Sequence, residues 1–154
     1  MAIAPDDPDF SFEAHGGFQT TSNATPDYNC IAWAAGRSDK WWWPDAGHKA
    51  YWPRGVPRSA TVDSFTKAFS LLGYSPCGTD DSFEGGFEKV AIFAKNGVPT
   101  HAARQLVAGP HAGSWTSKLG RGIDVAHHLH GAAGVLYGTV ILVMRRPVAA
   151  GTFP

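Results

Sequence analysis

The sequence has few cysteines, no excess of either charge and no long apolar run. Two cysteines in 154 residues cannot form a disulfide framework. A chain of this length can bury roughly 70% of its surface without one. The formal net charge of zero argues against a nucleic-acid partner and against electrostatic docking to a membrane. No apolar stretch reaches about 18 residues, the length of a membrane-spanning helix. These absences predict one globular domain.

Signals for export and for cofactors are equally scarce. The first ten residues hold three aspartates and no basic residue, unlike a signal peptide. We therefore expect a cytoplasmic protein, or one exported by a route that needs no signal peptide. The sequence contains neither a phosphate-binding loop nor a dinucleotide fingerprint, so no cofactor is predicted. The oligomeric state is left open.

Glycine and proline are abundant, with 18 and 11 residues, and imply many tight turns. Residues 1–27 are expected to form an extended arm, 28–147 a single domain and 148–154 a C-terminal tail. Helices are predicted from Cys30 to about Gly36 and from Ser59 or Thr61 to Leu72, and a short one at 123–129. Strands are predicted at 74–77, 87–93, 98–106, 115–119 and 137–145. Helices followed by an antiparallel sheet indicate an α+β fold.

Cys30 is the candidate nucleophile, because it stands in the first turn of its predicted helix. Amide N–H groups and the helix dipole at that position favour a thiolate and can hold an oxyanion. Asn29 and Gln19 are candidates to complete the oxyanion hole, although Asn29 could equally cap the helix. The alternative is that Cys30 is a small buried hydrophobic residue. Cys77 has no helix start beside it and is expected to be unreactive and not bridged to Cys30.

His101 is the candidate base. It lies in a predicted strand among small residues, and a histidine facing a helix start can pair with a thiol. The alternative is a histidine whose ring is satisfied by a backbone carbonyl.

Six segments of the chain resemble a family of small bacterial proteins of uncharacterised function. The likeness covers residues 28–147 and rests on 29–34 (NCIAWA), 41–44 (WWWP), 51–53 (YWP), 88–93 (EKVAIF), 99–105 (PTHAARQ) and 115–120 (WTSKLG). That family in turn is similar to the papain-like superfamily, in its NlpC-type and transglutaminase-like branches.

The second resemblance implies a papain-like α+β fold, with N-terminal helices packed on a C-terminal antiparallel sheet. It also implies a catalytic order of Cys30, His101 and Ser117. Serine departs from the usual orienting residue, so Gln105 and Asp124 remain alternatives for the third member.

An aromatic loop follows the predicted cysteine helix. Its rings could wall a substrate groove or could simply cover the core. The candidates for the groove are Trp42, Trp43, Trp52 and Trp115. Three histidines, His127, His128 and His130, have no cysteine or carboxylate at ligand spacing, so no metal is predicted.

Two functional hypotheses follow. The first is a cysteine hydrolase, either a peptidase, an amidase or a deamidase, acting on a peptide or another amide-containing substrate. The second is a non-catalytic binding module of the same papain-like scaffold, which uses the tryptophan-rich loop to hold a partner or ligand.

Overall fold

A single antiparallel sheet of seven strands dominates the protein. The computed structural model describes residues 3–148, and the strands follow the order β1-β6-β5-β4-β3-β7-β2. The strands are β1 (Phe18–Ser22), β2 (Ser75–Pro76), β3 (Phe87–Lys95), β4 (Val98–Gln105), β5 (Trp115–Lys118), β6 (Asp124–His127) and β7 (Thr139–Pro147). The α-helices are α1 (Cys30–Ala34) and α2 (Val62–Ser70), and 3-10 turns occur at Glu13–His15 and Leu129–Ala132.

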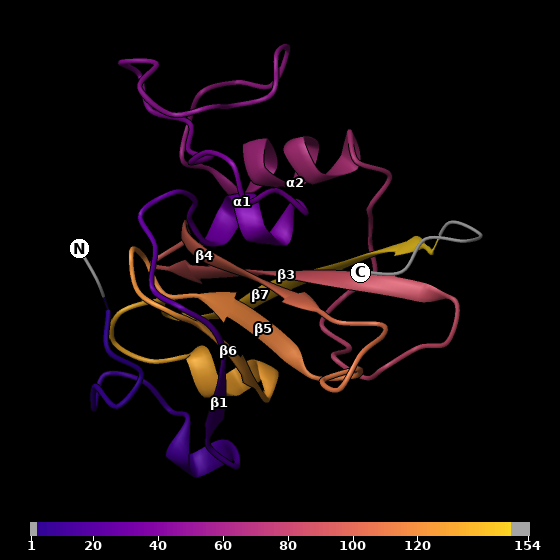
Figure 1. Ribbon diagram of the computed structural model, residues 1–154. Coiled ribbons are helices and arrows are strands. Elements are labelled where there is room, and N and C mark those ends of the chain that lie inside the picture. Colours follow the sequence, from indigo (N-terminus) through magenta and orange to yellow (C-terminus); the bar gives the residue numbers. More distant parts are fainter. Residues whose placement is uncertain (1–2, 149–154) are drawn as a thin grey trace.

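The sheet is the middle layer of the molecule (Figure 1). Helices α1 and α2 cover one face, and the two 3-10 turns lie on the other. Strand β3 supplies both hydrophobic clusters, because successive side chains of a strand point to opposite faces. Val90 and Ile92 join the cluster under the helices, whereas Ala91 and Phe93 join the opposite one.

The predicted papain-like α+β arrangement is wrong. Two short α-helices and one seven-stranded sheet are not a helical layer packed on a C-terminal sheet, and β1 precedes both helices along the chain. The segment predicted as a helix at 123–129 is mostly strand β6, which pairs with β5 on one side and β1 on the other. Pairing on both sides satisfies the backbone hydrogen-bonding groups of β6 and outweighs the helix preference expected from its local sequence. Residues 18–22 of the expected arm form β1.

Local signals located the other elements well. Thr61 caps α2 by accepting a hydrogen bond from the N–H of Ser64, as its side-chain type predicts. Asn96 and Gly97 both have positive φ and form the tight turn between β3 and β4. Apart from Val148, the predicted C-terminal tail lies outside the described residues.

We predict that Gly138 is essential to the packing beside β3. A Cβ at Gly138 would lie 2.0 Å from the carbonyl oxygen of Ala94, and φ is +75°. Gly97 is a matched control, because its φ is +78° but nothing lies within 4 Å of its Cβ position. Gly97→Ala should cost about 1–2 kcal/mol of unfolding free energy from the left-handed backbone alone. Gly138→Ala should cost at least about 2 kcal/mol more, because backbone must move. Denaturant titration measures both, and equal losses would contradict the prediction.

Candidate functional site

Asn29 fixes the start of α1 and therefore the position of Cys30. Its side-chain oxygen accepts hydrogen bonds from the N–H of Ala32 at 3.1 Å and of Trp42 at 3.0 Å. Its amide nitrogen donates to the carbonyl oxygen of Trp42 at 2.8 Å. Of the two roles that the sequence leaves open for Asn29, the structure shows the helix cap. The same side chain ties the aromatic loop to the helix start.

The thiol of Cys30 is buried and protonated at neutral pH. Burial raises its pKa to about 11 and outweighs the backbone N–H groups of Ala102, Ile31 and Cys30 itself, which lower it. The nearby ammonium of Lys118 lowers it further but only slightly. Helix α1 has five residues, too few for a strong dipole. The thiolate expected from the sequence is therefore not the form present at rest.

A chain of hydrogen bonds joins three neighbouring strands. His101 on β4 contacts Ser117 on β5, with 2.9 Å between Nε2 and Oγ. Ser117 contacts His127 on β6, with 2.7 Å between Oγ and Nε2. Nδ1 of His127 lies 2.6 Å from the carbonyl oxygen of His128. Ser117 thus lies between His101 and His127 and is hydrogen-bonded to both.

The hydrogen bond from His127 to the carbonyl oxygen of His128, at the end of this series, fixes the position of the hydrogen in each of the other bonds. A carbonyl oxygen only accepts, so Nδ1 of His127 carries the hydrogen. Burial lowers the pKa of His127 to about 4, so its Nε2 carries no hydrogen and accepts a hydrogen bond from the hydroxyl of Ser117. Ser117 in turn accepts from Nε2–H of His101. Burial also lowers the pKa of His101 well below 6.5, so its Nδ1 is an unprotonated lone pair. Within residues 3–148 that atom has no hydrogen-bond partner.

Tyr137 connects His101 to the surroundings of Cys30. Its ring stacks on the His101 ring, with centroids 3.9 Å apart and an interplanar angle of 8°. Tyr137 and Cys30 line the same pocket. Burial raises the pKa of Tyr137 well above 10, and coupling to Cys30 raises it further, so its hydroxyl stays protonated.

The backbone between His101 and Ala102 borders the thiol. The N–H of Ala102 faces the sulfur, while the Ala102 side chain lies in the cluster under α1. The His101 side chain contacts Phe93 and Tyr137, on the opposite face of β4. In the described part of the chain no hydrogen bond joins Cys30 to His101. Catalytic hydrogen bonds often form only when substrate binds.

The pocket beside Cys30 has a volume of about 490 Å³, and the rings of Trp41, Trp43 and Tyr137 lie in its walls. Trp42 and Trp52 lie in the same hydrophobic cluster as Cys30, but they are buried and do not line this pocket. Trp52 donates its N–H to the carbonyl oxygen of Pro57 at 3.1 Å.

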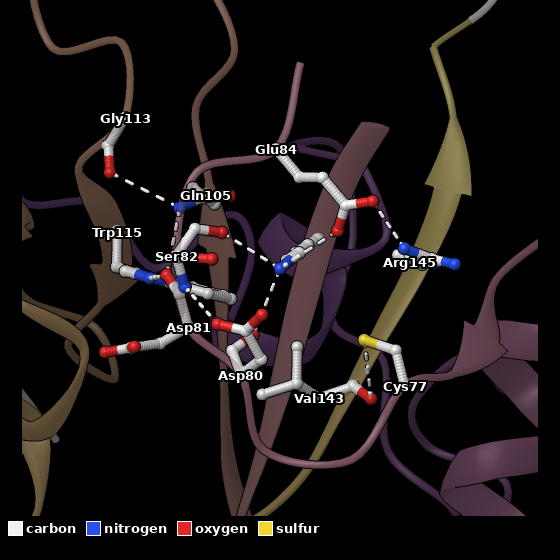
Figure 2. Close-up of polar contacts among 11 residues, drawn as sticks. Cys77, Asp80, Asp81, Ser82, Glu84, Gln105, Gly113, Trp115, Val143 and Arg145 are labelled. Atoms are coloured by element: carbon white, nitrogen blue, oxygen red, sulfur yellow. Dashed lines mark hydrogen bonds and ion pairs between the residues drawn. The ribbon is translucent and has the colours of Figure 1, made fainter. Parts of the chain in front are cut away.

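Gln105 and Trp115 both hydrogen-bond to the loop at residues 80–82 (Figure 2). Both donate to the carbonyl oxygen of Asp81, at 3.2 Å and 3.1 Å respectively. The buried ammonium of Lys89 binds the carbonyl oxygens of Asp80 and Ser82 in the same loop. Neither Gln105 nor Trp115 lines the pocket beside Cys30.

The two remaining candidates lie elsewhere. Asp124 accepts hydrogen bonds from Ser22 and Tyr28, and burial raises its pKa. Gln19 is exposed on β1 and lines a separate polar pocket, which His127 also reaches. Neither contacts His101 through a hydrogen bond in the described residues.

Cys77 and Cys30 are both free, as expected from their different settings. The thiol of Cys77 donates to the carbonyl oxygen of Val143 at 3.4 Å (Figure 2).

Sequence reasoning considered His127 only as a metal ligand and did not single out Tyr137. Residues 124–127 (DVAH) show no alternation that would indicate a strand, and the segment was predicted to be a helix, so nothing in the local sequence indicated that His127 faces Ser117. Tyr137 had no local signal, because its role comes from stacking on a residue far away in the sequence.

One sequence family matches this chain. The family, described as a domain of unknown function (DUF7689), matches residues 19–145. Neither the curated proteins nor the solved structures include a match. Among the described residues, no helix has the length and apolar character needed to cross a membrane.

We predict slow alkylation of Cys30 at neutral pH. With a pKa of about 11 instead of 9.0, the thiolate fraction at pH 7 is about 100-fold smaller than for an ordinary thiol. In a Cys77→Ala variant, iodoacetamide labelling followed by intact mass should accelerate roughly tenfold per pH unit up to about pH 10. Fast labelling that is already complete and pH-independent at about pH 6 would instead indicate a preformed thiolate.

We predict that buried His127 makes the fold acid-sensitive. The folded state holds its pKa at about 4, below the unfolded value of about 6.5. The unfolded chain therefore binds the proton first, and stability present above about pH 6.5 is lost as pH falls toward 4. The loss between about pH 7 and pH 4 is about 3 kcal/mol. His127→Gln should remove that part of the pH dependence in denaturant titrations, whereas His48→Gln, at an exposed site, should not. An unchanged slope in His127→Gln would refute the prediction.

Proposed function

The chain belongs to the DUF7689 family, and we propose that it is a cysteine-dependent hydrolase of amide or peptide bonds. Cys30 is the nucleophile and His101 is the general base. The observation that supports this proposal is the unprotonated Nδ1 of His101, which has no hydrogen-bond partner among residues 3–148. The hydrogen bonds through Ser117 and His127 keep the hydrogen of His101 on Nε2. The next residue along β4, Ala102, directs its N–H at the thiol.

The raised pKa of Cys30 and the lowered pKa of His101 mean that both groups start neutral. Attack and proton transfer must then occur together. The two side chains rest on opposite faces of β4, so substrate binding must first bring the thiol and Nδ1 of His101 within reach. The sulfur then forms a bond to the amide carbonyl carbon while its proton passes to Nδ1 of His101. The developing oxyanion can accept from the N–H of Ala102 and of Cys30, which already face the sulfur.

Collapse of that intermediate breaks the carbon–nitrogen bond. His101 returns its proton to the leaving amine, and the acyl group remains on Cys30 as a thioester. Water then attacks the thioester with His101 again as base, releasing a carboxylic acid and restoring the thiol. Ser117 and His127 act as positioning residues, because they keep the proton on Nε2 of His101 throughout.

A second candidate function is ligand binding without chemistry. The pocket with its indole walls would then hold a ligand, and Cys30 would serve only in packing. The raised pKa of the thiol favours this alternative, because a thiol that stays protonated is a weak nucleophile.

Turnover of p-nitrophenyl phenylacetate, an activated ester, separates the two. We expect release of p-nitrophenolate with a transient acyl adduct on Cys30, detected by intact mass. Cys30→Ala should abolish both, and His101→Asn should slow turnover by roughly 10²–10⁴-fold, because the proton acceptor is lost. Cys77→Ala is the matched control and should behave as wild type.

The pH profile adds a readout that a purely structural role would not produce. Because His101 has a pKa well below 6.5 and Cys30 one of about 11, kcat/KM should stay level between about pH 6 and pH 9. Ser117→Ala removes the hydrogen bond that fixes the tautomer of His101 and should lower kcat more than it changes KM. Absence of any acyl adduct in the folded wild-type protein would reject the hydrolase in favour of the binding module.

A further inference from the structure

We propose that the pocket beside Cys30 takes an amide whose acyl half is bulky and apolar and whose amine half carries a carboxylate, which Lys49 binds. This inference rests on the proposed function, since it names the substrate class of the same site. It comes from the walls of the pocket and from the balance of charge at its rim.

The walls suit an apolar group. Trp41, Trp43 and Tyr137 present aromatic rings, and Ile3 and Ala50 add aliphatic surface. The indole N–H of Trp41 already donates to the carbonyl oxygen of Pro26 at 2.6 Å, so it is not available to a ligand. Trp43 is fixed edge-on against Phe65, with ring centroids 5.5 Å apart. A volume of about 490 Å³ lies in the range of small-molecule sites.

One acidic and one basic side chain, Asp45 and Lys49, lie at the rim of the pocket, and they differ in how far their charges are already compensated. Asp45 accepts from the N–H of Lys49 at 2.8 Å and of Ala50 at 3.0 Å, and it pairs with Arg58 at 3.3 Å. Its negative charge is therefore already compensated. The Lys49 side chain is exposed, and its ammonium forms no ion pair within residues 3–148.

A second cation strengthens the positive side. The guanidinium of Arg121 lies over the Trp41 ring, 6.0 Å from its centroid. The charge left to act on a ligand at the rim is thus positive, and a carboxylate complements it.

The proposed reaction sets the orientation of the substrate, that is, which part of the pocket holds the acyl half and which the amine half. The thioester keeps the acyl half bonded to Cys30, in a pocket walled by aromatic rings, where the polar side chains of Asn29 and Thr100 are already hydrogen-bonded within the protein. The amine half takes its proton from His101 and departs, so its carboxylate belongs at the exposed rim with Lys49. N-acyl amino acids with large acyl groups, and peptides that end in a similar unit, have this composition.

Binding to a Cys30→Ala variant tests the substrate class without depending on turnover. The probes are N-phenylacetylglycine, N-acetylglycine and N-phenylacetylglycinamide, titrated by tryptophan fluorescence. Burying the phenyl ring should make the first probe bind roughly 10- to 100-fold tighter than the second. In a Cys30→Ala/Lys49→Gln double variant, affinity for the acid should fall about 3- to 10-fold, with no change for the amide. Lys67→Gln on α2 is the matched control, since Lys67 does not line this pocket.

The outcomes keep the two proposals apart. Equal affinity for the phenylacetyl and acetyl probes, or equal affinity for the acid and the amide before and after Lys49→Gln, overturns the substrate class even if Cys30 is acylated by esters. The expected preferences together with no acyl adduct on wild-type Cys30 overturn the hydrolase but support the pocket's ligand chemistry. Both preferences together with acylation support both.

Discussion

The hydrogen bond from Nδ1 of His127 to the carbonyl oxygen of His128 fixes the proton positions in the buried histidine–serine–histidine series. Because a carbonyl cannot donate, this bond fixes the tautomer of His127, then the direction of the Ser117 hydroxyl, and finally the tautomer of His101. Each of the three side chains stands on a different strand, so the pairing of β4, β5 and β6 must be in register for the chain to exist. The pairing of strands in the sheet, rather than a helix, therefore sets the tautomer of His101.

Burial favours the neutral form of the four buried titratable groups Cys30, Tyr137, His101 and His127. It raises the pKa of Cys30 and Tyr137 and lowers that of His101 and His127, so all four are neutral at rest. Neutral side chains at these buried positions avoid the cost of holding isolated charges away from water. The consequence for the proposed reaction is that charge develops only during attack, where backbone N–H groups are already in place.

The two halves of the site come from opposite faces of the sheet. Cys30 belongs to the cluster under the helices, and His101 packs against the opposite one. The N–H of Ala102, the residue after His101 in β4, faces the sulfur, and Tyr137, which stacks on His101, lines the pocket of Cys30. This arrangement gives the thiol an apolar pocket on one side and leaves the polar histidine chain on the other, with a separate polar pocket at His127.

The sequence alone determined the features that depend on neighbouring residues. The cap of α2 at Thr61, the turn at Asn96 and Gly97, and the placement of Cys30 at a helix start follow from local side-chain chemistry. Only the tertiary structure decided that residues 124–127 are a strand, that Phe18 pairs with His127, and that Ser117 continues to a second histidine. It also decided that the thiol is protonated. These features depend on register between distant strands and on burial, and neither leaves a mark in the local pattern of residues.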